Sequence, residues 1–133
     1  MFNQINQVFD FNQKALNIYV KRQEILASNI ANADTPGYKA VDINFKDELN
    51  KTLNKKDTKI ILKKTSPNHL NGKNNHISLL KIIPVISNNI KPDGNTVNMD
   101  RERIEFVNNS LKYVSTLAFI KNEIKNIIHV LQG

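Results

Sequence analysis

Apolar residues recur along the first quarter of the chain at intervals of three and four positions. The recurring residues are Ile5, Phe9, Leu16, Tyr19, Leu26, Ile30 and Ala33. This spacing predicts an amphipathic helix over residues 8–34, with an average repeat that is typical of coiled coils. Polar Asn12 and Gln23 interrupt the row and weaken it. A second row is formed by Phe11, Ile18 and Ile25. It widens the apolar face, so we expect this helix to contact more than one neighbour.

A second helix is predicted over the last third of the chain, from Asn98 or Asp100 to about Leu131. Either residue suits an N-cap, because both side chains can accept hydrogen bonds from free backbone amides. Gly133 follows the helix end, where glycine is favoured. One apolar row comprises Phe106, Tyr113, Leu117, Ile120, Ile124, Ile127 and Leu131, and another comprises Ile104, Val107, Leu111, Val114, Ala118 and Ile128. Two helices alone cannot cover such broad rows, so we expect the protein to oligomerise or its helices to be poorly ordered when free.

Between the helices, residues 35–95 lose this periodicity and are rich in Asn, Lys, Pro and Gly. Residues 60–62 and 79–86 are short β-prone pieces, and Pro84 limits the second to an edge strand or an extended segment. Pro92-Asp93-Gly94 predicts a turn. The expected fold class is therefore mainly α. Two long amphipathic terminal helices pack as a coiled-coil-like pair and bracket an extended or loop middle with at most a small β element.

The first helix should end at a fixed corner. Pro36 disfavours a helical conformation of Thr35 and has no N–H to donate. Pro36 and Gly37 suit the central positions of a type II turn, in which glycine supplies the positive φ. The chain then departs in extended form through residues 39–42.

Amide side chains precede this corner and an aromatic one closes it. The amides of Asn29 and Asn32 either bridge backbone groups at the corner and in a neighbouring subunit, or make local hydrogen bonds at the helix end. Tyr38 is expected to be a packing residue with a polar tip. The candidate corner motif comprises Asn29, Asn32, Asp34, Thr35, Pro36, Gly37 and Tyr38.

Composition and charge restrict the possible functions. The 133 residues contain no cysteine, which excludes disulfides and thiolate metal sites. No apolar run reaches membrane-spanning length, and the N-terminus has no basic and apolar regions of a cleavable signal. The net charge of +7 is concentrated in residues 51–92, which carry nine lysines against Asp57. An anionic partner is one interpretation of this segment, but the scarcity of arginine and aromatics favours a solvated surface.

The remaining polar residues show no arrangement that would support chemistry. The histidines His69, His76 and His129 are scattered, which argues against a zinc site. Asp100 and Glu102 suit helix capping better than acid–base catalysis. We therefore expect no enzyme activity, no cofactor and no metal.

A resemblance to a known family rests on the corner. The stretch SNIANADTPGYK, residues 28–39, resembles the N-terminal signature of the bacterial flagellar rod and hook proteins. Residues 40–45 resemble the proximal-rod subunits, the FlgB type, and residues 65–70 and 92–102 agree with that type. The resemblance implies a structural subunit of the basal-body rod, which connects the membrane ring to the distal rod and transmits torque. The alternative is a basic nucleic-acid-binding helical protein that uses residues 51–92.

The resemblance also implies an assembly plan. Residues 1–34 and 96–133 would be the terminal helices of a tube-forming domain, and residues 35–95 a lysine-rich middle segment. The residues expected to pack the helices are Leu16, Tyr19, Leu26, Ile30, Leu111, Val114, Leu117, Ile124, Ile128 and Leu131. Phe45 and Leu49 fit the pattern that early flagellar export substrates present at the export gate.

Partners and location are implied in the same way. They are other rod subunits, the ring–rod junction subunit, the membrane-ring protein and the export gate, with no nucleic acid and no membrane span. The axial rod in the periplasm is the expected destination, reached by flagellar type III export without a cleaved signal. Ile5, Val8 and Phe9 would act as an N-terminal export signal or be buried as ordinary helix residues.

Overall fold

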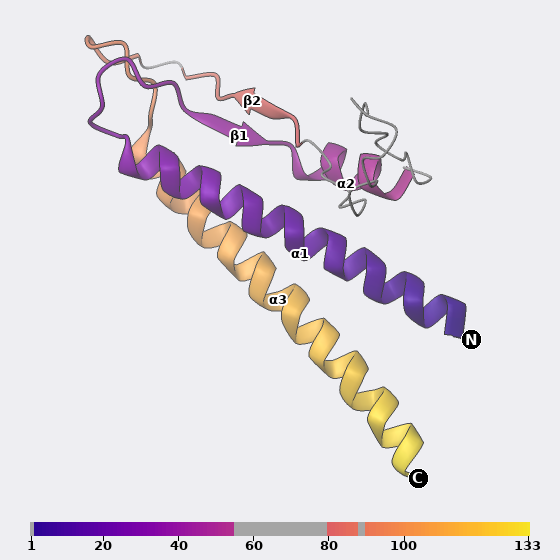
Figure 1. Ribbon diagram of the computed structural model, residues 1–133. Coiled ribbons are helices and arrows are strands. Elements are labelled where there is room, and N and C mark those ends of the chain that lie inside the picture. Colours follow the sequence, from indigo (N-terminus) through magenta and orange to yellow (C-terminus); the bar gives the residue numbers. More distant parts are fainter. Residues whose placement is uncertain (1, 55–79, 88–89) are drawn as a thin grey trace, which may run out of the picture.

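Two long helices dominate the computed structural model, which describes residues 2–54, 80–87 and 90–133 (Figure 1). They are α1, Phe2–Ala31, and α3, Met99–Gln132, and they run antiparallel. Between them in sequence lie β1, Val41–Ile43, then α2, Phe45–Asn54, then β2, Ile82–Pro84. Helix α1 contacts α3, α2 and β1. The expected mainly α architecture is confirmed, and α1 has the several neighbours that its two apolar rows predict.

The ends of both long helices follow local chemistry. Asn98 caps α3, since its side-chain oxygen accepts hydrogen bonds from the amides of Asp100 and Arg101 at 3.1 and 3.2 Å. Gly133 ends α3 with a φ of +82°. Helix α1 spans more of the N-terminus than predicted and ends at Ala31 rather than at residue 34. Its last turn tightens there, because the amide of Ala33 bonds to the carbonyl of Ile30 rather than to that of Asn29.

Helix α2 was not expected from the composition of the middle segment. Its N-terminus is capped by Asn44, whose side-chain oxygen accepts a hydrogen bond from the amide of Asp47 at 3.3 Å. Asp47 and Glu48 lie in the first turn and Lys51 in the last, which suits the helix dipole. Abundant Asn and Lys in this region obscured a capping pattern that the sequence does contain.

The small sheet is an antiparallel two-stranded ribbon. Val41 pairs with Pro84, Asp42 with Ile83 and Ile43 with Ile82. Pro84 is tolerated because each strand of such a ribbon has an open edge. The edge-strand prediction for residues 79–86 is thus confirmed at Ile82–Pro84, whereas residue 79 and the β-prone residues 60–62 lie outside the described part of the chain.

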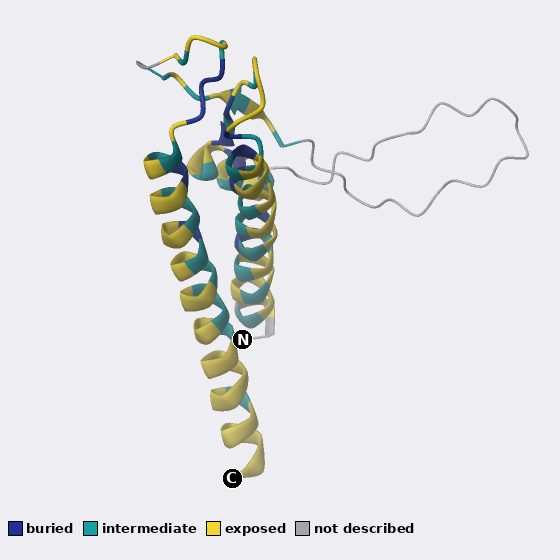
Figure 2. Ribbon diagram, turned by 90° about the vertical axis from the view of Figure 1, so that its left-hand side faces the viewer, coloured by how far each residue is buried: buried dark blue, intermediate teal, exposed yellow. Residues whose placement is uncertain are grey.

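Among the described residues, polar side chains are buried as often as apolar ones. The largest fully buried side chains are Leu26, Glu48, Glu102, Asn29, Asn95 and Asn109. A small apolar cluster of Ala33, Ala40 and Val97 lies at the corner. Buried residues gather where the ribbon meets the helices, and the C-terminal half of α3 is mostly exposed (Figure 2). No helix among the described residues has the length and apolarity needed to cross a membrane.

Candidate functional site

Two turns meet at the end of α1 and form the corner. The amide of Tyr38 donates to the carbonyl of Thr35 at 3.2 Å, and Gly37 has a φ of +72°, as the predicted type II turn requires. The amide of Gly37 donates to the carbonyl of Asp93 at 3.0 Å, which joins the corner to the second turn. That turn, residues 91–94, closes with a 2.8 Å hydrogen bond from the amide of Gly94 to the carbonyl of Lys91.

Asn95 closes the C-terminal end of α1 from outside the helix. Its fully buried side-chain nitrogen lies 3.0, 3.0 and 2.8 Å from the carbonyl oxygens of Asn32, Ala33 and Thr35. Its side-chain oxygen accepts from the amide of Val97 at 2.8 Å. The last carbonyls of a helix have no partner within the helix. These three carbonyls also accept hydrogen bonds from the Thr35 amide, Lys91 Nζ and the Tyr38 amide, so Asn95 adds a second, buried donor to each of them.

Asn29 joins the same helix to β1. Its side-chain nitrogen donates to the carbonyl of Val41 at 2.7 Å and to Glu102 Oε2 at 2.9 Å. Its side-chain oxygen accepts from the amide of Val41 at 3.2 Å and from the Tyr38 hydroxyl at 3.3 Å. Asn32 instead makes a local bond to the carbonyl of Ser28 at 2.8 Å. Within the chain, Asn29 thus bridges backbone groups at the corner, whereas Asn32 stabilises the helix end.

Charged side chains extend this network across three elements. Arg22 of α1 binds both carboxylate oxygens of Asp42 in β1 at 2.9 and 2.8 Å, and Glu105 of α3 at 2.8 Å. Arg101 of α3 reaches Asp42 at 2.9 Å and Glu102 at 2.5 Å. We refer to Arg22, Asn29, Asp42, Arg101, Glu102 and Glu105 as the polar joint. It fixes β1 to both long helices by paired groups, of which Asn29, Asp42 and Glu102 are buried and the other three partly exposed.

Ion pairing decides the charge state of the joint. Burial by itself would raise the pKa of Asp42, but hydrogen bonds from Arg22, the Ile43 amide and Arg101 outweigh it and hold the pKa below its ordinary value. The hydrogen bond to Asp42 raises the pKa of Arg22, which stays charged. The joint therefore works with Asp42 ionised.

A pH dependence of stability follows from Asp42. Because its pKa is lower in the folded than in the unfolded state, ionised Asp42 stabilises the fold fully above the ordinary value of 3.8, and this contribution is lost as pH falls below it. We expect the free energy of unfolding to exceed that of Asp42→Asn at neutral pH, and the difference to shrink below about pH 4. Urea unfolding of both proteins across this range measures it. A difference that stays constant or grows on acidification would contradict the assignment.

A second polar contact joins α1 to α3 beyond the joint. Asn109 is buried and donates to the carbonyl of Tyr19 at 2.9 Å and to the side-chain oxygen of Gln23 at 2.5 Å. Gln23 donates in turn to the Ser110 hydroxyl at 2.8 Å. Gln23 therefore does not simply weaken the helix row, as its position in the sequence indicates, but pairs across the interface. The side-chain oxygen of Asn109 is buried without a hydrogen-bond partner.

The other predicted residues lie at three places. Asp34, Thr35, Pro36 and Gly37 are exposed at the corner, and Tyr38 is half-buried. Of the expected packing residues, Leu26 is buried and Leu16, Tyr19, Ile30 and Leu117 are half-buried, while Leu111, Val114, Ile124, Ile128 and Leu131 are exposed. Phe45 and Leu49 are half-buried on α2, where the Phe45 ring stacks on Tyr19 with centroids 4.3 Å apart.

The corner glycine allows a sharp test of the turn. No atom lies within 4 Å of the position that a Cβ at Gly37 would occupy, so the cost of substitution is backbone strain rather than a clash. We expect Gly37→Val to lower the free energy of unfolding by about 2 kcal/mol, and Gly37→Asn by much less, because asparagine tolerates positive φ. Thermal unfolding of both variants checks this. Equal losses would show that strain at Gly37 is not the cause.

Four residues that dominate the network were missed by the sequence analysis: Arg22, Asp42, Asn95 and Glu102. Arg22 and Asp42 did carry a signal, because each is a charge inside a row of apolar residues. Arg22 follows Ile18 by four positions, and Asp42 separates Val41 from Ile43. Charges at such positions are rarely buried unless they are paired. Asn95 and Glu102 carried no comparable signal, because asparagine after a turn and glutamate at the start of a helix are both common.

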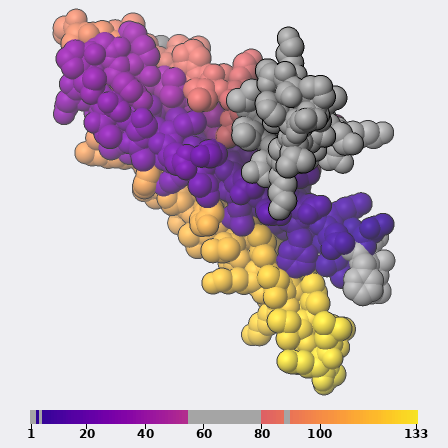
Figure 3. Space-filling model, viewed as in Figure 1, coloured from indigo at the N-terminus to yellow at the C-terminus, as the bar shows by residue number. Residues whose placement is uncertain are grey.

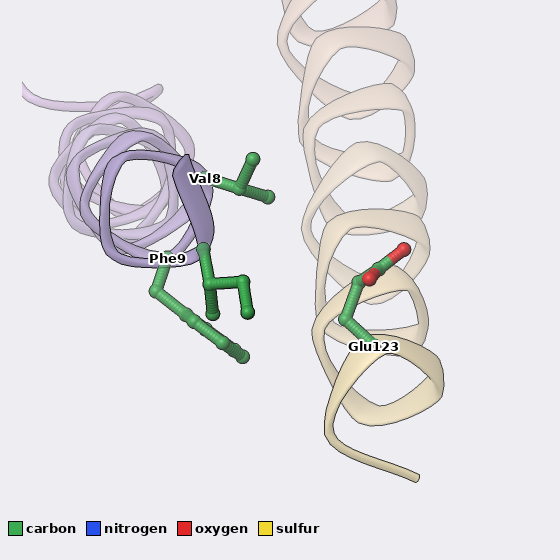
Figure 4. A pocket seen from close by; sticks show the side chains of 4 residues that line it. Val8, Phe9 and Glu123 are labelled. Carbon is green, nitrogen blue, oxygen red and sulfur yellow. The ribbon is translucent and has the colours of Figure 1, made fainter. Parts of the chain in front are cut away.

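A cavity of about 150 Å³ lies at the opposite end of the helix pair, lined by Ile5, Val8, Phe9 and Glu123. Val8 and Phe9 project from α1 toward the gap beside α3, where Glu123 lies (Figure 4). One carboxylate among apolar side chains provides neither a nucleophile with its base nor a metal site. Among the described residues, no group of three or more His, Cys, Asp or Glu is placed to hold a metal ion.

Known proteins resemble this chain along its whole length. A family described as flagella basal body rod protein matches residues 9–39. The flagellar basal body rod protein FlgB of Buchnera aphidicola subsp. Acyrthosiphon pisum is 69% identical over 133 residues, all of both chains. FlgB of Salmonella typhimurium is 41% identical over 136 residues and FlgB of Escherichia coli is 40% identical over 136 residues, each covering 100% of this chain and 99% of the relative.

Proposed function

We propose, from the premise that this chain belongs to the FlgB family of flagellar basal body rod proteins, that it assembles through the exposed faces of its terminal helices while the polar joint orients its middle segment. The chain is a structural subunit of the rod and not an enzyme, as the family is. The comparisons give the nucleic-acid-binding alternative no support, and residues 55–79 of that basic segment lie outside the described structure.

The observation that carries the proposal is the apolar surface left exposed on α3. Its exposed large residues are Ile104, Val107, Leu111, Val114, Phe119, Ile124, Ile128, Val130 and Leu131, with exposed fractions from 43% to 82%. This much exposed apolar surface along one helix favours protein association. The C-terminal end of α3 also projects past the N-terminus of α1, which leaves it open to neighbouring subunits (Figure 3).

The joint supplies the second part of the proposal. Its ion pairs and amide bonds lie within one chain, so the direction in which β1 and α2 leave α1 does not depend on neighbours. In this scheme residues 1–34 and 96–133 form the tube-forming unit and residues 35–95 are the segment that the corner directs. If the joint fixes this direction, every subunit has the same angle between its long helices and its β-ribbon. A fixed angle suits torque transmission, because the subunit does not bend at the corner under load.

Assembly with other basal-body components follows from the family. The finer assignment that we propose is contact with the ring–rod junction subunit, the membrane-ring protein and other proximal-rod subunits, in the periplasmic part of the axis. Type III export of the uncleaved chain, with Phe45 and Leu49 read by the export gate, belongs to the same proposal. Both side chains are partly covered by the folded protein, which is consistent with recognition before folding.

The test is quantitative mass spectrometry of basal bodies purified from cells that express this chain, with the ring protein as reference. We expect enrichment at a few copies per ring, and loss of that enrichment in Ile124→Ser/Ile128→Ser, which removes two apolar side chains that are 43% and 47% exposed. Asn122→Ser, a polar change on the same helix, is the control and should assemble normally. Recovery of the chain in a soluble or nucleoid fraction instead would contradict the proposal.

A further inference from the structure

An apolar ridge runs along the outside of the first half of α3. It consists of Ile104, Val107, Leu111 and Val114, with exposed fractions of 59%, 55%, 61% and 60%. The intervals of three, four and three residues place all four side chains in one line, as in the seam of a coiled coil. We call this line the outer ridge. No other part of the described chain covers it.

The helix that bears the outer ridge is held in place from its other side. Glu102 and Asn109 are buried on the inward face, where they bond to Asn29 and Gln23 of α1. Glu105 is held by Arg22 at 2.8 Å. The ridge is therefore presented by an anchored segment, so a partner that binds it need not also order this part of the helix.

Charge is segregated between the two sides of α3. Its acidic residues are largely turned toward α1: Glu102 and Glu105 belong to the polar joint, and Glu123 lines the cavity beside Phe9. The charged residues along the outward face of α3, on the line of the outer ridge, are basic instead. Arg103 precedes Val107 by four positions, and Lys121 and Lys125 follow Val114 and Ala118 by seven, all three exposed. Beyond Asp100, at the start of the helix, no acid lies along this outward line.

We propose that the outer ridge docks an amphipathic helix of a different subunit, one whose apolar seam is flanked by carboxylates. This rests on the proposed function and names the chemistry of one partner. A second copy of α3 would place bases against bases, which costs free energy and selects against self-pairing through this face. A lipid surface fits less well, since lipid-binding helices add aromatic anchors to the apolar face and the ridge has only Ile, Val and Leu.

The experiment uses the purified full-length chain and two synthetic heptad-repeat peptides with the same Ile/Leu seam, one flanked by Glu and one by Lys. Fluorescence anisotropy should show the Glu-flanked peptide binding about tenfold or more tightly than the Lys-flanked one, and weakening with salt. Leu111→Ser/Val114→Ser should lower that affinity about tenfold. Phe119→Ser removes an equally exposed apolar side chain that lies off the ridge, and it should bind as the wild type does. Lys121→Glu/Lys125→Glu should reverse the preference between the peptides.

Circular dichroism of each variant first establishes that it is folded. Equal binding of both peptides would overturn the proposal. So would self-association that disappears in the Leu111→Ser/Val114→Ser variant, or binding to vesicles of anionic phospholipid without binding to either peptide. The test is independent of rod incorporation. Peptide selectivity in a chain that is absent from basal bodies would refute the proposed function alone, whereas incorporation without selectivity would refute the ridge assignment alone.

Discussion

We expect Arg22→Met to lower the free energy of unfolding of this protein by about 3 kcal/mol, the low end for breaking a buried ion pair, because Asp42 loses its bidentate partner and keeps Arg101 as its remaining cationic partner. The Arg22 guanidinium holds both oxygens of Asp42 and one oxygen of Glu105, and its side chain is only 13% exposed. Methionine keeps the length and apolar stem of the side chain, so the loss reports the charge and its hydrogen bonds. Urea unfolding at neutral pH followed by circular dichroism measures the difference.

A matched control lies one position earlier. Lys21 pairs with Glu24 at 2.7 Å, but both side chains are more than half exposed, at 57% and 59%. Exposed pairs of this kind contribute about 1 kcal/mol or less, so Lys21→Met should change the free energy of unfolding by less than about 1 kcal/mol. Similar losses for the two variants would mean that position along the helix, and not the polar joint, determines the effect.

The second large effect is expected at Asn95→Asp. The substitution is nearly isosteric, yet it replaces the amide that donates to the carbonyls of Asn32, Ala33 and Thr35 with an acceptor. A buried carboxylate facing three carbonyl oxygens should cost about 3 kcal/mol or more. Protonation of the new carboxyl supplies one donor, so part of the loss should be regained on acidification. Thermal unfolding at two pH values checks both statements.

The same chemical change three residues later should be nearly silent. Asn98 caps α3 by accepting hydrogen bonds from two backbone amides, and an aspartate oxygen accepts them equally well. Asn98→Asp should therefore alter the free energy of unfolding by less than about 1 kcal/mol, and negative charge at the helix N-terminus is favourable. If Asn98→Asp is as damaging as Asn95→Asp, donation by Asn95 is not what closes the end of α1.

Elements with local causes were predictable from the sequence. The long helices follow from three- and four-residue spacing, the corner from Pro36-Gly37, and the start of α3 from Asn98. Capping also defines α2, but its Asn44–Asp47 pattern is common in a chain so rich in asparagine. The apolar rows of α1 correctly indicated several neighbours.

The polar joint was largely unpredictable, because its members are far apart in sequence. Asp42 and Arg101 are 59 residues apart, and Asn29 and Glu102 are 73 apart. Only the packing of β1 against α1 and α3 brings them together. Arg22 and Asp42, as charges within apolar rows, were the only sign that such a network exists. Of its members, the sequence analysis identified Asn29 as a corner residue, through a motif that resembles a family.

The N-terminal half of α3 is bonded to α1, whereas its C-terminal half is mostly exposed. The two halves should therefore differ in stiffness. Near the corner, ion pairs and amide bonds internal to the chain resist any change of angle. Farther along, where α1 and α3 are separated by the cavity beside Glu123, few contacts within the described chain oppose bending. In a helical assembly, small differences between the surroundings of successive copies should therefore be absorbed by flexing of the distal helix halves. The corner should keep the same geometry in every copy.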